Sequence, residues 1–446
     1  MVYKIMNKEL SKTLKEIGLK AQSASAELNT AANDQKNMFF DFAIKSIKEN
    51  TDVILSANQI DIQAAKENGK DEAFIDRLAL DENRLQGICN TLAEIKLFED
   101  PVGKELASWE RPNGLKISRV STPLGVIGLI FESRPNVAAD AGGLCLKSGN
   151  AVILRSGKDG LRSATAIVNC LQNALKDADL PKECIQIVPS ESREAATMML
   201  EGLNGSIDVI VPRGGKSLVA EVEKSAKVPV FGHLEGICHI YVDEYADEKK
   251  ALSVCLNAKM RRTGICGAVE TILVHEKITE TFVPKLVELL SDANCEVRCC
   301  EKTVSLDARA VPASAEDWST EYLAPIISLK SVSNIDEAIS HIENFGTGHT
   351  ESIISENEHN QSMFTKSIDS AIVMINASTQ FADGGEFGLG GEIGIATGKF
   401  HARGPVGVDQ LTSFKYIVSG DGQIREPCLF FLTSSSEACS PSILES

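Results

Sequence analysis

The sequence lacks the features that mark a secreted, membrane-bound or nucleic-acid-binding protein. It has no apolar run close to the ~20 residues that span a bilayer, and Met1 to Lys20 alternate charged and apolar residues without a signal-peptide core. Positive charge is in deficit, since 45 Lys and Arg stand against 62 Asp and Glu, giving a formal net charge of −17. We therefore expect a cytoplasmic protein whose partners include no nucleic acid and no membrane.

Paired cysteine spacing is absent as well. The 12 cysteines are scattered, which suits a reducing cytosol better than a disulfide framework. Cys295, Cys299 and Cys300 are close together, but no histidine or second cysteine pair completes a zinc pattern. The sequence thus predicts no metal site.

The chain does contain enough apolar residues, 43% of 446, for two or three sizeable cores. Residues 1–110 have mainly helical patterns, including 34–50 and 57–69. From residue 151, short apolar strands (151–154, 185–188, 208–211 and 228–231) alternate with helices (161–177, 193–203 and 216–226). This alternation predicts a parallel sheet with right-handed crossovers, an architecture that binds dinucleotides.

A second alternating series runs from about residue 238 to 375. The expected fold class is therefore α/β, with two doubly wound parallel-sheet domains. The stretches 114–130 and 401–416 look different. We interpret them as strands of a small β element that pairs across a subunit boundary.

Cys266 is the most informative residue. It follows an expected helix whose last turn is basic, with Arg261 and Arg262, and Gly264 and Gly267 lie on either side. Cations favour the thiolate form of a cysteine, and glycines let a substrate carbonyl approach the sulfur. The pattern favours a nucleophile for acyl transfer, although an inert packed cysteine fits the local sequence too.

Two basic, glycine-containing turns connect a strand to a helix. The first contains Arg155, Gly157 and Lys158, and the second contains Arg213, Gly214 and Gly215. Backbone N–H groups and cations in such turns suit a phosphate, but neither turn is a GxGxxG fingerprint, and a solvated charged turn is the alternative.

Asn136 follows the apolar run 124–130. A side-chain amide here can donate a hydrogen bond to an oxyanion beside the nucleophile. The alternative is an asparagine that caps the following helix.

Further tracts follow in a recognisable order: 346–350 (GTGHT), 386–388 (EFG) and 403–405 (RGP). Together with the tracts above they resemble the aldehyde dehydrogenase superfamily over about residues 7–425. The resemblance is closest to the branch that reduces γ-glutamyl phosphate in proline biosynthesis. It implies NADPH-dependent reduction of L-glutamyl 5-phosphate to L-glutamate 5-semialdehyde, with release of phosphate, through a cysteine thioester.

The resemblance also implies residue roles. Cys266 would be the nucleophile and Asn136 an oxyanion donor, while Glu321 would contact the nicotinamide ribose. The residues expected to bind cofactor are Arg155, Gly157, Lys158, Arg213, Gly214, Gly215, Glu321 and Phe387. The residues expected to bind substrate are Arg134, Arg261, Arg262 and Arg403.

Two positions refine the expected chemistry. Lys158 stands where NAD-preferring relatives carry a glutamate, and its charge attracts a 2′-phosphate, so NADP is the expected cofactor. His233 stands where hydrolytic relatives carry a general-base glutamate, which favours a reductase over an enzyme that hydrolyses its thioester. A hydrolytic aldehyde dehydrogenase and an inactive cofactor-binding scaffold are the rival hypotheses.

By resemblance, residues 1–113 and 131–236 form the cofactor domain and 237–400 the catalytic domain. Residues 114–130 and 401–425 would form the oligomerisation element. The Ser-rich composition of 426–446 predicts a poorly ordered tail, which departs from the usual ending of the family. The expected partners are a second copy of the chain, in a dimer or tetramer, and functionally a glutamate 5-kinase.

Overall fold

The computed structural model describes residues 2–389 and 391–425. The chain divides into two compact units. The first comprises Met1–Val102 and Thr122–Ser413, and the second comprises Gly103–Ser121 with the described residues of Phe414–Ser446. The predicted tail 426–446 lies outside the described residues.

Five helices open the first unit: α1 (Val2–Leu28), α2 (Asn33–Glu49), α3 (Thr51–Glu67), α4 (Glu72–Leu78) and α5 (Glu82–Lys96). Aspartates cap the N-termini of two of them. The Asp71 side chain accepts a hydrogen bond from the N–H of Phe74 in α4, and the Asp81 side chain accepts one from the N–H of Arg84 in α5. The predicted helix 57–69 starts earlier, at Thr51. These helices contribute Phe39, Phe40 and Leu92 to the largest apolar core of the unit.

Four parallel strands form the first sheet, in the order β5-β4-β3-β6. They are β3 (Val126–Phe131), β4 (Ala151–Ser156), β5 (Ile185–Ile187) and β6 (Val209–Arg213). The helices between them and after β6 are α6 (Val137–Lys147), α7 (Leu161–Asp177), α8 (Arg193–Leu200) and α9 (Lys216–Ser225). The predicted strand 228–231 is wrong, because only the bridge between Ile210 and Val230 forms there. Pro229 has no N–H with which to extend a ladder.

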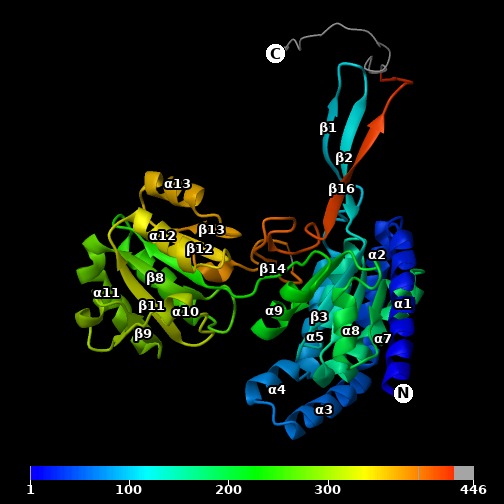
Figure 1. Cartoon of the computed structure of the whole chain (residues 1–446), viewed down its shortest axis with the longest axis horizontal. Helices are drawn as coiled ribbons and strands as arrows, with labels where there is room; N and C mark the ends of the chain where they lie inside the picture. Colours follow the sequence, from blue (N-terminus) through cyan, green and yellow to red (C-terminus); the bar gives the residue numbers. More distant parts are fainter. Residues whose placement is uncertain (1, 390, 426–446) are drawn as a thin grey trace, which may run out of the picture. The chain divides into compact units, whose positions relative to one another are not determined.

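Seven parallel strands form the second sheet, in the order β10-β9-β11-β8-β7-β12-β13. They are β7 (Cys238–Val242), β8 (Val269–His275), β9 (Glu296–Cys299), β10 (Val311–Pro312), β11 (Ile326–Val332), β12 (Thr350–Ile354) and β13 (Ile372–Ile375). Around it lie the helices α10 (Glu248–Met260), α11 (Glu276–Asp292), α12 (Ile335–Phe345) and α13 (Glu358–Ser367) (Figure 1). Both faces are covered, since Ile240 packs with α10 and α11 while Tyr241 packs with α12 and α13.

The remaining elements of the first unit are short. The 3-10 helices are η1 (Lys158–Gly160), η2 (Lys182–Cys184), η3 (Val304–Leu306), η4 (Glu316–Ser319) and η5 (Thr379–Phe381), and β14 (Ile395–Ala396) pairs with β15 (Gly404–Pro405). The predicted α/β fold with two parallel sheets is confirmed. Among the described residues, no helix is long and apolar enough to cross a bilayer.

The second unit is a β ribbon built from β1 (Glu105–Glu110), β2 (Lys116–Pro123) and β16 (Thr412–Ser419), in the order β1-β2-β16. The predicted boundaries of this element differ from the structure. The range 114–130 includes β3, which belongs to the four-stranded sheet, and omits β1. The pattern is interrupted after Pro123, where Gly125 has a φ of +124° that side-chain-bearing residues rarely adopt.

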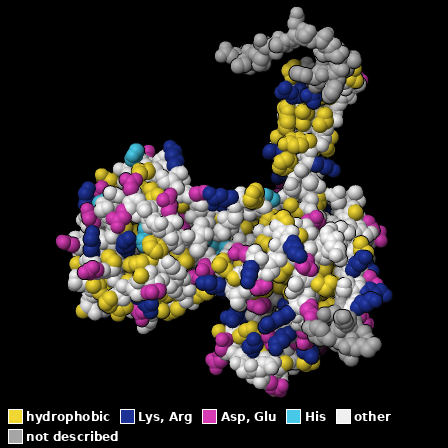
Figure 2. Space-filling view, in the orientation of Figure 1, with side chains coloured by type: hydrophobic (Ala, Val, Ile, Leu, Met, Phe, Trp, Pro, Cys, Tyr) yellow, Lys and Arg dark blue, Asp and Glu magenta, His cyan; other side chains and the backbone are white. Residues whose placement is uncertain are grey.

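Hydrophobic side chains gather on this ribbon (Figure 2). Trp109 is 42% exposed and packs edge-on against Tyr416, which is 56% exposed, with ring centroids 6.1 Å apart. The other large apolar residues exposed on its strands are Leu106, Phe414, Ile417 and Val418. An exposed apolar patch of this kind marks an interaction surface.

Candidate active site

Cys266 lies in the connection between α10 and β8, and its side chain is half-buried. A fully buried ion pair holds the base of this connection, because Lys259 at the end of α10 bonds to Glu270 at the start of β8. Gln380 adds two hydrogen bonds through Nε2, which donates to the carbonyl oxygens of Ala258 (2.8 Å) and Arg262 (3.1 Å). The connection is therefore fixed by the core even though it is irregular.

Gly236 lies in close contact with the backbone of the connection between α10 and β8. A Cβ at Gly236 would overlap the carbonyl oxygen of Cys266 and lie 2.8 Å from its Cβ. The N–H of Gly236 donates to Glu321 Oε1 at 3.0 Å. Burial raises the pKa of Glu321, and the hydrogen bond from Gly236 opposes that rise. One glycine thus brings the Cys266 and Glu321 tracts together.

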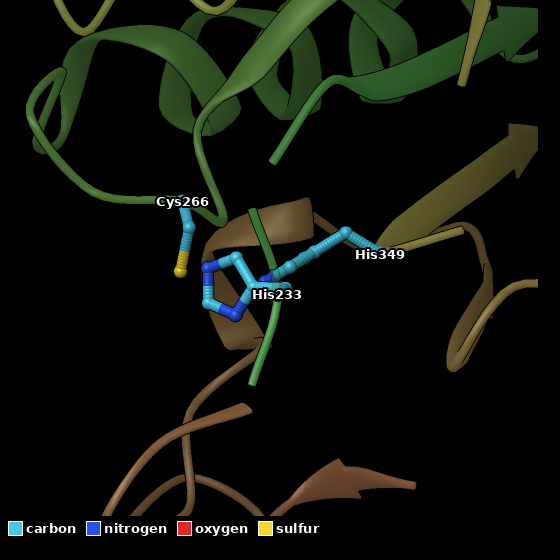
Figure 3. A group of neighbouring side chains, drawn as sticks. All are labelled: His233, Cys266 and His349. Atoms are coloured by element: carbon cyan, nitrogen blue, oxygen red, sulfur yellow. The ribbon is translucent and has the colours of Figure 1, made fainter. Parts of the chain in front are cut away.

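Two histidines accompany the thiol. The Sγ of Cys266 and one ring nitrogen from each of His233 and His349 all lie within 4.8 Å of one another. In Figure 3 the side chains of Cys266 and His349 both extend toward the His233 ring. His233 Nδ1 lies 2.6 Å from the carbonyl oxygen of Ile395, and burial lowers its pKa, which favours the neutral imidazole.

The pKa of Arg134 reports the charges in its neighbourhood, which include the Cys266 thiol. Desolvation lowers the pKa of Arg134, and the positive charges of Arg213, Arg77 and Arg262 lower it further, while Cys266 opposes the change. Of the predicted substrate residues, Arg134 and Arg262 therefore lie near the thiol. Arg77 was not predicted, because it comes from α4 and nothing in its local sequence singles it out.

Asn136 occupies the N-cap position of α6 but makes no side-chain capping bond. Its Nδ2 instead donates to Asp140 Oδ2 at 2.9 Å. Burial raises the pKa of Asp140 to about 6, against the opposing effects of Asn136 and Arg213. The capping interpretation is therefore wrong, and the oxyanion role stays a prediction.

The predicted phosphate turns lie at the carboxyl ends of β4 and β6, the two strands that flank β3 in the first sheet. Gly157 follows β4, and its N–H donates to the carbonyl oxygen of Phe131 at 2.7 Å. The N–H of Glu132 donates to the carbonyl oxygen of Arg213 at 3.2 Å. A Cβ at Gly214 would lie 2.9 Å from Glu132 Oε2. Glu132 was not predicted to belong to this site, although it lies between the apolar run 124–130 and Asn136.

Arg155 and Lys158 differ in their surroundings. Arg155 is buried at the end of β4, and its Nε has no hydrogen-bond partner among the described residues. Burial lowers its pKa, and the charge of Glu132 opposes this. Lys158 begins η1 and is exposed, whereas Gly215 leads into α9 with open space where a Cβ would stand.

Three predicted residues lie in different settings. Phe387 is 45% exposed. Arg261 is exposed at the end of α10, with Nη1 3.5 Å from Gln380 Oε1. Arg403 is paired with Asp369 at 2.7 Å, so its charge is already compensated within the fold.

The comparisons with known proteins agree with one another. The profile of the "Aldehyde dehydrogenase family" matches residues 15–304 and 308–417. The γ-glutamyl phosphate reductases of Brucella suis biovar 1 (strain 1330) and Parvibaculum lavamentivorans are both 54% identical to the chain, over 94% of its length and 100% and 98% of theirs. The crystal structure of γ-glutamyl phosphate reductase from Thermotoga maritima superposes with a TM-score of 0.91 and 44% identity, covering 93% of this chain and 100% of that one.

A more distant structure shares the fold alone. The acetylating aldehyde dehydrogenase from Geobacillus thermoglucosidasius is 17% identical with a TM-score of 0.66, over 95% of this chain and 99% of that one.

The contact at Gly236 leads to a stability prediction. In Gly236→Ala the new methyl group meets backbone that the Lys259–Glu270 pair holds in place, so we expect a loss of about 1–3 kcal/mol in the free energy of unfolding. Urea unfolding followed by circular dichroism measures it. The control is Gly87→Ala in α5, where a Cβ meets nothing within 4 Å. Equal stability of the two variants would show that the close contact is absent.

Proposed function

Because this chain belongs to the aldehyde dehydrogenase family, and within it to the γ-glutamyl phosphate reductases, we propose that it reduces L-glutamyl 5-phosphate to L-glutamate 5-semialdehyde with release of phosphate. The family uses a nicotinamide cofactor, and we assign NADPH to this chain. The observation that carries the proposal is that the charges of Cys266, Arg213 and Arg262 all act on Arg134, which brings a thiol and cations into one neighbourhood. A nucleophile and a set of cations for a phosphate leaving group are what an acyl phosphate requires.

In the proposed mechanism the thiolate of Cys266 attacks the γ-carbonyl carbon, and the carbonyl π electrons move onto oxygen. The Nδ2 amide of Asn136 donates to this oxyanion after turning away from Asp140. When the carbonyl re-forms, the C–O bond to phosphate breaks, and phosphate leaves with the electron pair beside Arg134 and Arg262. The product of this half-reaction is a γ-glutamyl thioester on Cys266.

The residues of the first sheet fit a phosphorylated dinucleotide. The buried Arg155 Nε has no partner among the described residues, and the turns at Gly157 and Gly214 come together at the ends of parallel strands. Arg155, Arg213 and Lys158 would hold its phosphates, and Glu321 the nicotinamide ribose. The bound cofactor supplies the hydride that reduces the thioester.

The chain's own residues also protect the thioester from water. His233, not a carboxylate, stands at the position of the general base of hydrolytic relatives, and its Nδ1 lies 2.6 Å from the Ile395 carbonyl oxygen. Because the carboxylate of those relatives is missing from this position, we propose that hydride and not water resolves the thioester.

The reverse reaction tests the proposed function. With L-glutamate 5-semialdehyde and NADP⁺, we expect NADPH to form at a sustained rate only when inorganic phosphate is present, because phosphate is the acyl acceptor. Absorbance of NADPH measures the rate. Sustained turnover without phosphate would identify a hydrolytic aldehyde dehydrogenase instead.

The matched control uses two cysteines that are both half-buried. Cys266→Ala should lose turnover, by at least about 1000-fold, because no other group forms the thioester. Cys300→Ser should retain it. NADPH binding, measured by fluorescence, should survive in both variants.

Cofactor choice depends on Lys158 in this proposal. We expect Lys158→Glu to lower the ratio of kcat/KM for NADPH over NADH by about tenfold or more, the equivalent of one lost charge-assisted hydrogen bond. Steady-state kinetics with both cofactors measure the ratio. Lys20→Glu, an equal charge change at an exposed position in α1, is the control. An unchanged ratio in Lys158→Glu would remove this residue from the 2′-phosphate site.

We further propose that the β ribbon joins copies of the chain into an oligomer. Its strands carry exposed Trp109, Tyr416 and Val418, and burial of such side chains against a second copy is favourable. Sedimentation should show an oligomer for the native chain and a lighter species for the double variant Ile417→Glu, Val418→Glu. Leu97→Glu, at an 81% exposed position in the first unit, should leave the oligomer intact. A monomeric native chain would refute the proposal.

A further inference from the structure

We propose that Cys266, His233 and His349 form a zinc site through which Zn²⁺ reversibly caps the nucleophile. The three candidate donor atoms lie within 4.8 Å of one another. In a tetrahedral zinc site, bonds of about 2.0–2.3 Å place neighbouring donors roughly 3.5 Å apart. Modest side-chain rotations therefore bring these atoms onto one ion. A thiolate and two imidazoles also bind zinc in preference to magnesium or calcium.

The hydrogen bonds of both histidines leave a nitrogen available for a metal. His233 Nδ1 must carry a proton, since it lies 2.6 Å from the carbonyl oxygen of Ile395 and can only donate there. The lone pair of the neutral ring is then on Nε2. Zinc-bound histidines commonly donate their second N–H to a carbonyl group in this way, which fixes the tautomer and the ring orientation.

His349 provides an independent observation. Its side chain is fully buried, and its Nε2 has no hydrogen-bond partner among the described residues. Its Nδ1 lies 2.8 Å from Thr350 Oγ1 and 3.6 Å from Cys238 Sγ, so this nitrogen is already engaged. An orphaned buried nitrogen is costly, and coordination of a cation would satisfy it.

The neighbouring charges compensate each other. Arg134 and Arg262 near the thiol oppose a cation, but the thiolate itself is an anion. The charges of Glu321 and Glu392 also act on His233, so carboxylates lie in the same neighbourhood as the arginines. Cys238 is already engaged elsewhere, because its Sγ donates to the Cys266 carbonyl oxygen at 3.1 Å.

Three protein ligands leave the fourth tetrahedral position of zinc to water or an anion. Binding releases the thiol proton to solvent and places the sulfur electron pair in the Zn–S bond. The sulfur is then unable to attack an acyl phosphate. That inhibitory consequence rests on the proposed function of Cys266, whereas the binding of zinc does not.

The test measures zinc binding directly on the full chain. Zn²⁺ is titrated against a chromophoric chelator in a buffer free of phosphate and thiols. We expect one tight site in the native protein and at least about tenfold weaker binding in Cys266→Ser, His233→Asn and His349→Gln. Cys300→Ser and His359→Ala, whose side chains lie outside the cluster, should bind zinc as the native chain does. Binding of equal strength in all six proteins would overturn the proposal.

A second measurement does not depend on variants, so a misfolded His349→Gln would not obscure the result. Iodoacetamide alkylation of Cys266, followed by peptide mass spectrometry, should slow at least tenfold with one equivalent of Zn²⁺ and recover with a chelator. Alkylation at the same rate with and without zinc would refute the site. If zinc protects Cys266 but the protein fails to reduce its substrate, the proposed function is wrong and the metal site stands.

Discussion

The constraint on which the site depends is the contact between Gly236 and the backbone of Cys266. The absence of a side chain at Gly236 lets the segment before β7 pass directly beneath the nucleophile, while its N–H binds Glu321. The buried Lys259–Glu270 pair fixes the other side of the same connection. A buried pair of this kind costs desolvation energy but strongly penalises any displacement of either partner. The thiol is therefore held by backbone and core, not by its own contacts.

In the proposed function, one cysteine serves two half-reactions within this arrangement. We propose that the arginines whose charges act on Arg134 stabilise a leaving phosphate and that the turns after β4 and β6 bind a dinucleotide. His233 and His349 place two imidazoles close to the sulfur, and in the proposed function His233 stands where a hydrolytic enzyme needs a carboxylate. Two imidazoles and a thiol are also a donor set that suits zinc, as the proposed metal site requires.

Much of this could be predicted from the sequence, and the exceptions share a cause. The strands β4, β6 and β7 could be predicted because a buried parallel strand appears in the sequence as a short apolar run between two helical segments. Arg77, Glu132 and His349 were missed because their proximity to Cys266 or to the phosphate turns arises only in three dimensions. The border between β2 and β3 was missed because β-branched residues continue from one strand into the other, although only β3 is apolar throughout. Roles drawn from resemblance, such as those of Asn136 and Phe387, remain predictions.

The most direct measurement of the central claim is mass spectrometry of the Cys266 peptide. The protein would be mixed with L-glutamate 5-semialdehyde and NADP⁺ in the absence of phosphate and then quenched in acid. The account predicts a γ-glutamyl group on Cys266 that disappears when phosphate is added before the quench. An unmodified Cys266, in a sample that makes NADPH once phosphate is present, would contradict it.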